Sequence, residues 1–527
     1  MNTLYSSYKP LLKFILYLHV EFSSETAEFI NIFLYRNSIL NSFRRGTTIK
    51  PDILLFHPPK NFSFYNLPEL IKPDQPADTS IKYLSIGYRL LYLTAYLKER
   101  GYKTECWNIP LAYHQGYDNQ SILRIIKPNY PLLIGIDLSA PPQIMGSIAL
   151  AKFLKKQFPN TPIFMNGMLP SLFREEILKS CDSIDILIPG ESEKVVIEIC
   201  DAIERKKEYT DITGTIVRNN GKFIKNEGKN IVKDIDQIPP YSVDCLMPKF
   251  LNLENRAIIN TCSGPCKYDC IYCVRANSCY SLSPRSKMEF HSIKWITEQF
   301  EILLNHTDRF SIEDHCSCNP KFINKLTETI KKEGLDERIK FLNVTVIPSE
   351  SINQKTLEDF NAAGINSIDL GIESGSDRLL TFLNRPYNIK QVADITKKAI
   401  KNDIITKTYW MVTGFEEKND LNATRKLLKN TIKTGAVPFL SVLALFPRTQ
   451  LYDNPDNFKV TLNFSTFEDY QAFSKNTRFK RRKTTHKTDI MNVKDMEKAL
   501  NGFKSVLENH KKDIKKNLQN FRRILRN

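Results

Sequence analysis

Three cysteines near the middle of the chain have a spacing that suits an iron–sulfur cluster. Cys266, Cys270 and Cys273 form the pattern Cys-x3-Cys-x2-Cys, and Tyr272 directly precedes the last of them. Clusters that only carry electrons are held by four cysteines, whereas three thiolates leave one iron of a cubane without a protein ligand. That iron is open to a substrate or a cofactor, so the pattern predicts chemistry at a 4Fe-4S cluster. Tetrahedral zinc is the alternative, because Cys-x2-Cys and Cys-x3-Cys pairs also suit it.

The cysteine pattern resembles that of radical S-adenosylmethionine (SAM) enzymes. The resemblance implies that Cys266, Cys270 and Cys273 bind the cluster, and that the amine and carboxylate of the methionyl group of SAM chelate the open iron. Cys262 lies where those enzymes often have a small residue, so it is not counted among the ligands. An electron donor such as flavodoxin or ferredoxin is then an expected partner.

Two acidic segments further along the chain strengthen the resemblance. The sequence of residues 370–377, Leu-Gly-Ile-Glu-Ser-Gly-Ser-Asp, resembles the fourth-strand motif of the same enzymes. Its glycines let the backbone approach the cofactor, and Glu373 and Ser374 can hydrogen-bond ribose hydroxyls. Glu313 and Asp314 stand where the family contacts the methionyl amine, which a carboxylate would pair with. Each acidic residue alone is more simply a solvated loop end, but their order and spacing together indicate SAM binding.

Two more cysteines follow the second predicted strand. Cys316 and Cys318 belong to the sequence His-Cys-Ser-Cys that begins at His315. Thiols near the cluster could act on the substrate or hold a second metal, but buried, unreactive cysteine is the more common outcome. The sequence leaves their role open.

Alternating strand and helix patterns position these motifs. Residues 251–455 contain six strand-like runs with helical patterns between them, which predicts a partial (β/α)6 barrel of the TIM type. The cysteine loop directly follows the first run, at the carboxyl end where such barrels place their active sites. The predicted strands are Arg256–Asn260, Phe310–Glu313, Phe341–Val346, Ser367–Ile372, Thr406–Val412 and Phe439–Leu443.

Residues 51–205 show the same alternation and predict a doubly wound, Rossmann-like α/β domain with a parallel sheet covered on both faces. Ligands of such sheets bind beyond the carboxyl ends of the strands, in loops that here contain Ser139 and Gly167. The order of elements resembles the cobalamin-binding domain that precedes the barrel in one large class of radical SAM enzymes, which implies that these loops contact cobalamin. The Asp-x-His-x-x-Gly signature that supplies a histidine to cobalt is absent, and His114 is not assigned as an axial ligand. A domain that has lost its corrinoid is the alternative.

The remaining segments are predicted from composition and pattern. Residues 1–50 are predicted as a helical extension, residues 206–250 as a connector, and residues 456–527 as a basic region with one long amphipathic helix. The formal net charge is +17, and residues 475–527 hold 17 Lys and Arg against 5 Asp and Glu. A tail of this charge at the barrel entrance would favour an anionic substrate, such as an acidic peptide or a phosphorylated intermediate. A helix that only closes the open side of the barrel is the alternative, and a nucleic-acid partner is not favoured.

Cysteine usage and the N-terminal sequence indicate the compartment. The chain has eleven cysteines, most of them scattered singly, and no signal-peptide pattern, so a reducing cytoplasm is predicted rather than a disulfide framework. The apolar run at residues 11–18 is too short and too charged to cross a bilayer, so no membrane anchor is expected.

The predicted function is that of a cobalamin-dependent radical SAM enzyme, with methyl transfer to an unactivated carbon or phosphorus of a small molecule or peptide as the favoured reaction. The resemblance implies that SAM is cleaved to a deoxyadenosyl radical and that methylcobalamin supplies the methyl group. Oxidation, rearrangement or cyclisation on the same scaffold is the first alternative, because substrate-facing residues vary within one fold. A noncatalytic cobalamin or metal sensor is the second, and the intact cysteine loop argues against it.

Overall fold

The structure is a computed structural model of the 527-residue chain. It describes residues 51–59, 88–114, 117–127, 130–247, 256–276, 284–314, 317, 319–348, 352–475 and 484–524. The helical extension predicted over residues 1–50 lies outside these ranges. His315, Cys316 and Cys318, whose role the sequence left open, also lie outside them.

The first sheet has eight strands. They are β1 (Ile53–His57), β2 (Thr104–Asn108), β3 (Leu133–Asp137), β4 (Ile163–Gly167), β5 (Ile186–Pro189), β6 (Thr215–Asn219), β7 (Lys222–Asn226) and β8 (Leu246–Met247). Their order is β7-β6-β5-β4-β3-β1-β2-β8, and every pair from β5 to β8 along this order is parallel. The strand order reverses between β1 and β3, which is the switch point where doubly wound sheets bind ligands.

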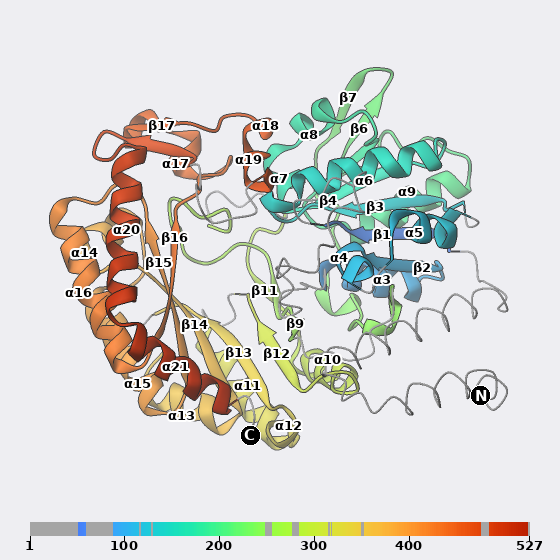
Figure 1. The fold of residues 1–527 in the computed structure, drawn as a ribbon. Helices are drawn as coiled ribbons and strands as arrows, with labels where there is room; N and C mark the ends of the chain where they lie inside the picture. The colour runs from blue at the N-terminus through green and yellow to red at the C-terminus, as the bar shows by residue number, and fades with distance from the viewer. Residues whose placement is uncertain are drawn as a thin grey trace, which may run out of the picture.

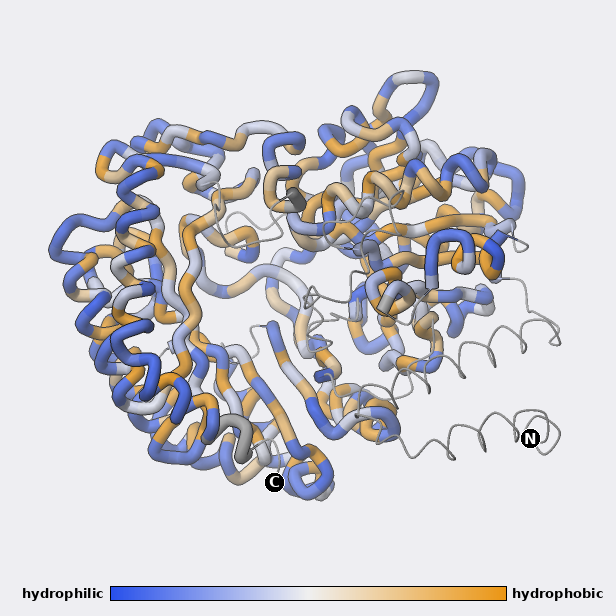
Figure 2. Tube along the Cα trace, viewed as in Figure 1, coloured by the Kyte–Doolittle hydropathy of each residue, from blue (hydrophilic) through white to orange (hydrophobic). Residues whose placement is uncertain are grey.

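Helices cover both faces of this sheet (Figure 1). They are α3 (Tyr88–Glu99), α4 (Ile109–His114), α5 (Asn119–Ile126), α6 (Ile144–Gln157), α7 (Met168–Phe173), α8 (Glu175–Ser180) and α9 (Glu193–Glu204). Ile53 and Leu55 of β1 belong to the core that includes α3 and α9, whereas Leu54 and Phe56 belong to the core that includes α5 and α6. Figure 2 shows apolar residues concentrated along the strands. The predicted doubly wound domain is therefore confirmed as a fold.

The predicted connector, residues 206–250, adds strands to both edges of this sheet. β6 and β7 form an antiparallel hairpin, whose turn residues Asn220 and Gly221 have φ angles of 48° and 77°. Positive φ at both central positions is the type I′ geometry that favours Asn-Gly. β8 pairs with β2 at the opposite edge. The strand-like runs of this segment thus complete the sheet, while the predicted domain limits stay a prediction.

The second sheet forms the barrel and has six strands. They are β9 (Ala257–Ile259), β12 (Arg309–Ile312), β13 (Phe341–Val346), β14 (Ile365–Glu373), β15 (Ile405–Val412) and β16 (Val437–Val442). They pair in this order, and all neighbours are parallel. The helices between them are α10 (Ile293–Leu304), α11 (Pro320–Lys332), α12 (Leu335–Arg338), α13 (Gln354–Ala362), α14 (Asp377–Phe382), α15 (Ile389–Lys401) and α16 (Lys418–Thr434). Each of the six predicted strands is present, so the partial barrel is confirmed.

The C-terminal region packs on the last two strands of the barrel and on the first domain. Its helices are α18 (Phe467–Tyr470), α19 (Ala472–Lys475), α20 (Val493–Asn509) and α21 (Lys511–Ile524). The predicted single long helix is two helices, because the backbone at His510 leaves the helical region, with φ −116° and ψ 23°. α20 packs on β15, β16 and α16, and α21 packs on β16 and α16, while the proposed role of the tail in substrate binding stays a prediction. α18 and α19 contact α8 and α6 of the first domain (Figure 1).

The lengths and apolar character of the helices bear on whether any of them could cross a membrane. None of the helices in the part of the chain that the structure describes combines the length and the apolar character that a bilayer requires. The apolar run at residues 11–18 is not part of that description.

Candidate active site

The cysteine loop follows β9 at the carboxyl edge of the barrel strands. Its first residues form β10 (Cys262–Ser263), which pairs with β11 (Glu289–Phe290) in a small antiparallel sheet. Gly264 then turns the chain with φ of +100°, and a Cβ atom there would lie 2.3 Å from the Lys287 carbonyl oxygen. Only glycine fits this turn, which fixes where the cysteine motif begins.

Cys266, Cys270 and Cys273 come together in this loop. Cys266 and Cys270 are each 6% exposed, and Cys273 is half-buried. Burial raises the pKa of Cys273 to about 11, and the neighbouring thiols of Cys270 and Cys266 act in the same direction. Metal binding at such thiols must displace their protons. No three His, Cys, Asp or Glu side chains in the described ranges converge on a single metal ion, and cluster ligands need not do so, since each thiolate binds its own iron.

Arg385 connects the cysteine loop to β14, and the sequence analysis missed it. Its guanidinium donates hydrogen bonds to Cys270 Sγ at 3.4 Å and to the Tyr272 hydroxyl at 3.1 Å. It also donates to the Gly371 carbonyl oxygen at 3.3 Å, and it lies 3.8 Å from Oε1 of Glu373. Burial raises the pKa of Cys270, and the positive charge of Arg385 opposes that rise. One buried cation thus positions a predicted cluster ligand, the aromatic residue of the motif and the predicted SAM-binding strand.

Glu373 and Ser374, predicted to contact the ribose of SAM, lie at the end of β14. Glu373 has a φ of +63°, which is uncommon for a residue other than glycine and typical of ligand sites. Burial raises the pKa of its carboxyl group, and Arg385 opposes the rise. Ser374 is 1% exposed, and its hydroxyl lies 3.2 Å from that of Thr424 on α16. Ser374 therefore also holds α16 in place, and the ribose contacts of both residues stay a prediction.

Glu313 and Asp314 have different surroundings at the end of β12. Asp314 is 3% exposed and accepts hydrogen bonds from the Thr261 hydroxyl at 2.8 Å and from the Cys262 N–H at 3.1 Å. It thereby fixes the start of the cysteine loop. Glu313 is accessible to solvent, yet surrounding protein atoms raise the pKa of its carboxyl group, and nearby Asp369 adds to the rise. The contact of this pair with the SAM amine stays a prediction.

Ser139 and Gly167 meet at the carboxyl edge of the first sheet. Ser139 Oγ donates to Asp137 Oδ1 at 2.5 Å, and a Cβ atom at position 167 would lie 2.7 Å from Ser139 Oγ. His57, which the sequence analysis did not single out, ends β1 beside them, with Nδ1 3.7 Å from Asp137 Oδ2. Its Nδ1 and Oδ1 of Asn166 are buried without a hydrogen-bond partner in the described ranges. Such atoms at the switch point fit a polar ligand.

A buried ion pair joins the ligand-binding edges of the two sheets. Glu191, in the loop after β5, accepts hydrogen bonds from Arg285 Nε at 2.6 Å and Nη2 at 2.7 Å. The Arg285 side chain is fully buried and also donates to the Val232 carbonyl oxygen at 2.7 Å. Ser263, at the start of the cysteine loop, donates to Glu191 at 2.8 Å. The carboxyl edge of the first sheet therefore lies against the cysteine loop.

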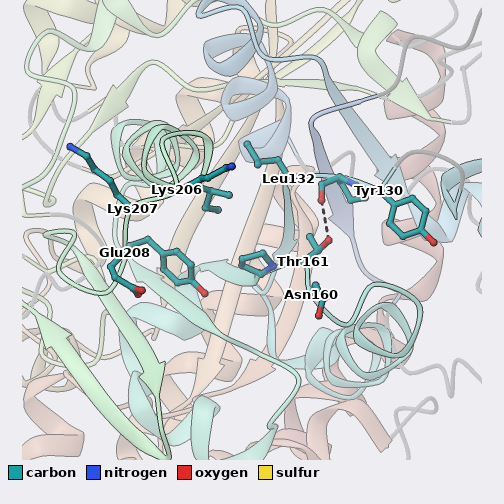
Figure 3. Close-up of a pocket in the computed structure, with 11 residues that line it drawn as sticks. Tyr130, Leu132, Asn160, Thr161, Lys206, Lys207 and Glu208 are labelled. Atoms are coloured by element: carbon teal, nitrogen blue, oxygen red, sulfur yellow. Dashed lines mark hydrogen bonds between the residues drawn. The ribbon is translucent and has the colours of Figure 1, made fainter.

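A surface hollow of about 540 Å³ lies at the opposite edge of the first sheet (Figure 3). It is lined by residues that precede β3 and β4, by the last turn of α9 and by residues that follow this helix. Thr161 donates there to the Pro131 carbonyl oxygen at 3.0 Å (Figure 3). The hollow contains no predicted site residue, so the candidate active site remains at the carboxyl edges.

The fold and the site define a class of protein: a three-cysteine loop on a partial barrel, joined to a doubly wound ligand-binding domain. Residues 261–428, which contain the three cysteines and Glu373, match the family model of the radical SAM superfamily. Residues 261–428 are therefore a radical SAM domain, which agrees with the family that the sequence analysis predicted. The zinc and sensor alternatives lose their support, although the roles of individual cysteines stay a prediction.

Two curated relatives agree with this assignment. The chain is 26% identical over 355 residues to an uncharacterized methyltransferase of Pyrococcus horikoshii, covering 66% of this chain and 74% of the relative. It is 23% identical to the anaerobic magnesium-protoporphyrin IX monomethyl ester cyclase of Rubrivivax gelatinosus, covering 65% of this chain and 60% of that enzyme.

Solved structures match over most of the chain. The methyltransferase TsrM from Kitasatospora setae, with tryptophan and a SAM analogue bound, superposes with a TM-score of 0.66 at 14% identity, over 86% of this chain and 88% of that one. The cobalamin-dependent radical enzyme OxsB, with aqua-cobalamin and SAM bound, gives a TM-score of 0.58 at 14% identity, over 81% of this chain and 55% of that one. These matches confirm the fold of the cobalamin-dependent class. TsrM holds cobalamin, a 4Fe-4S cluster and a SAM analogue in these structures, which are the cofactor types predicted here.

Glu193 at the joined edges predicts a pH-dependent stability. Burial and the neighbouring Glu191 raise its pKa to about 7, from an ordinary value of 4.5. Between these two pH values the folded chain holds a proton on Glu193 that the unfolded chain releases. The contribution of Glu193 to stability is therefore full below about pH 4.5 and is lost as the pH rises through 7. We expect the free energy of unfolding of Glu193→Gln, measured with urea, to match that of the parent near pH 5. Near pH 8 the variant should be more stable by a few kcal/mol, since each pKa unit corresponds to about 1.4 kcal/mol.

The exposed Glu204 on the same helix provides the control for this experiment. Glu204→Gln should keep the pH dependence of the parent chain. If the stability of Glu193→Gln also varied with pH as that of the parent does, the claim that Glu193 is buried and protonated in the folded chain would be wrong.

Proposed function

We propose that this chain is a cobalamin-dependent radical SAM methyltransferase that acts on a small molecule. The observation that carries the proposal is the Glu191–Arg285 pair, which sets the ligand edge of the first sheet against the cysteine loop. A methyl carrier at one edge and SAM at the other then share one space between the two sheets. Both carboxyl edges are the places where these fold types bind ligands.

The barrel edge offers a set of residues that fits a cluster with SAM. Cys266, Cys270 and Cys273 would hold the cluster, which, when bound, would supply the electron that cleaves SAM. Arg385 fixes Cys270 relative to Glu373, so the sulfur ligand and the predicted ribose acceptor keep one geometry. The buried carboxylate of Glu373 would accept hydrogen bonds from ribose hydroxyls. An electron donor such as flavodoxin or ferredoxin completes this proposal.

The edge of the first sheet fits a corrinoid. His57 Nδ1 and Asn166 Oδ1 are buried polar atoms without hydrogen-bond partners in the described part of the chain, and the amide side chains of a corrin ring would satisfy them. Gly167 keeps this edge free of a side chain. Cobalamin, when bound, would supply the methyl group. His114 ends α4 and is not assigned to cobalt.

The relatives support methyl transfer to a small molecule. One is named a methyltransferase, and TsrM is a methyltransferase with tryptophan bound. Cyclisation is the second candidate, because the Rubrivivax gelatinosus relative is a cyclase of magnesium-protoporphyrin IX monomethyl ester. Tryptophan and the protoporphyrin are both flat ring systems, so the named relatives favour such a substrate.

Loss of one predicted cluster ligand should abolish SAM cleavage. After anaerobic reconstitution with iron and sulfide, we expect the parent chain to show the cluster absorbance and to release 5′-deoxyadenosine from SAM when reduced. Cys270→Ala should lose both, because its thiolate is one of only three proposed ligands. Cys245→Ala removes a half-buried cysteine outside the motif and should behave like the parent. A Cys270→Ala variant that cleaves SAM at the parent rate would overturn the proposed cluster site.

A side chain at position 167 should close the corrinoid site. Gly167 has φ of +112°, and an added Cβ would meet Ser139 Oγ at 2.7 Å. We expect Gly167→Ala to bind hydroxocobalamin at least roughly tenfold more weakly, measured by the visible absorbance retained after gel filtration, since both strain and lost space act there. SAM cleavage should be unchanged.

Gly221→Ala supplies the matched control, because Gly221 also has a positive φ, +77°, but nothing lies within 4 Å of its added Cβ. It should retain cobalamin as the parent does. Equal retention by all three proteins would argue against a corrinoid at the Ser139–Gly167 edge.

A further inference from the structure

The lumen of the barrel is lined by side chains that the proposed function has not used. On β15, Thr408 and Trp410 are fully buried, whereas Tyr409 between them is 37% exposed. Successive strand residues point to opposite faces, so Tyr409 and Lys407 point away from the covering helices and into the lumen. Phe439 of β16 pairs with Tyr409 in the sheet and is 41% exposed. Their rings stack at 5.1 Å and form an aromatic surface that solvent reaches.

A hydrogen-bonded network holds the floor of this lumen. Lys407 Nζ lies 2.5 Å from Asp369 Oδ1, and the Tyr409 hydroxyl donates to the same oxygen at 3.3 Å. Asn343 Nδ2 donates to Asp369 Oδ2 at 2.8 Å. Both oxygens of Asp369 are therefore occupied as acceptors. Lys407 has three N–H donors and uses one of them for Asp369, so it retains donors for a ligand.

Arg256 adds a second cation to the floor. It directly precedes β9 and stands two residues before Ile258, so the strand alternation places both on one face. Ile258 pairs with Ser311, whose hydroxyl accepts a hydrogen bond from Asn343 at 3.1 Å. Arg256 forms no hydrogen bond or ion pair among the described residues and lies 4.5 Å from the centre of the Phe341 ring. Burial lowers the pKa of Lys407, and the positive charge of Arg256 acts in the same direction, which places the two cations near each other. Glu313 lies near the same two cations, because Lys407 and Arg256 both lower the pKa of its carboxyl group. The floor thus combines two carboxylates with two cations, and Arg256 and Lys407 keep N–H donors that no described residue uses.

The aromatic surface lies between this floor and the predicted SAM site. Asp369 and Glu373 share one face of β14 and are four residues apart, about 13 Å along a strand. Tyr409 pairs with Gly371, midway between them. Gly371 has no side chain, and a Cβ there would approach Glu373 Oε1 to 3.0 Å. A molecule that reaches from the floor to the cofactor edge therefore passes the Tyr409–Phe439 surface.

We propose that this lumen is the substrate site, and that it takes a molecule with a flat apolar ring and a carboxylate at one end. The ring stacks on Tyr409 and Phe439, and the carboxylate accepts hydrogen bonds from Lys407 and Arg256. The other end of the molecule then faces Glu373 and the cofactors. This inference rests on the proposed function for its chemistry, but the binding preference follows from the lumen residues alone.

Two probes of the same shape test the preference: 2-naphthoate and its uncharged analogue 2-naphthamide. We expect the full-length protein to bind naphthoate more tightly than naphthamide in calorimetric titration without SAM. Arg256→Gln should weaken naphthoate binding roughly tenfold and leave naphthamide unchanged, because one charge-assisted hydrogen bond is lost. Phe439→Ala should weaken both probes. Arg256 and Phe439 are both exposed, so neither variant removes a buried core residue.

Two substitutions outside the lumen provide controls. Arg338→Gln removes an exposed arginine of α12 that pairs with Glu301, and Tyr130→Ala removes a tyrosine that is 64% exposed. Neither should change the binding of either probe. No saturable binding of naphthoate to the parent at millimolar concentration, or equal effects of lumen and control variants, would overturn the inference.

Measuring 5′-deoxyadenosine release in the same proteins separates the two claims. Retained SAM cleavage with no lumen-dependent binding refutes the substrate site and leaves the proposed function standing. Lumen-dependent binding without SAM cleavage in the parent refutes the proposed function and supports the lumen as a ligand site.

Discussion

The relation between the two sheets depends on the buried pair of Glu191 and Arg285. Two parallel N–H···O contacts of 2.6 Å and 2.7 Å make it a fork-like, directional link, and the arginine side chain has no exposed surface. Arg285 also forms an ion pair with Glu289, so the link between the two sheets belongs to a small network of charges around a buried arginine. Ser263 ties the cysteine loop to the carboxylate of Glu191. The carboxyl edges of both sheets are therefore set toward one shared space, with a defined orientation.

Arg385 plays a comparable part within the barrel. The cysteine loop follows the first barrel strand and the SAM motif ends the fourth, so a contact between them must cross the barrel mouth. The guanidinium makes that contact through Cys270 and Tyr272 on one side and Gly371 on the other. Below this level, the lumen changes from the strand end that is predicted to bind SAM to the aromatic surface of Tyr409 and Phe439, and then to the charged floor. The barrel thus presents a graded environment along one axis.

Local patterns in the sequence predicted the fold well. Apolar runs of strand length located both sheets, and the cysteine spacing predicted the loop of the candidate active site. Residues that depend on contacts across the fold were not predicted. Arg385 lies outside every motif that was identified in the sequence. His57 directly follows an apolar run, so it was interpreted only as the end of a strand. Asp314 and Ser374 were predicted as cofactor contacts from their positions, but their side chains also bond Thr261 and Thr424, which no sequence spacing reveals.

The central claim is that a cluster at the cysteine loop and a corrinoid at the first sheet lie in one shared space. The most direct test is the electron paramagnetic resonance spectrum of protein that carries a reduced cluster and cob(II)alamin together, compared with protein that carries each alone. Both centres are paramagnetic, so the account predicts a magnetic interaction that broadens or splits both signals. A spectrum equal to the sum of the two separate spectra, in protein shown to hold both cofactors, would contradict it.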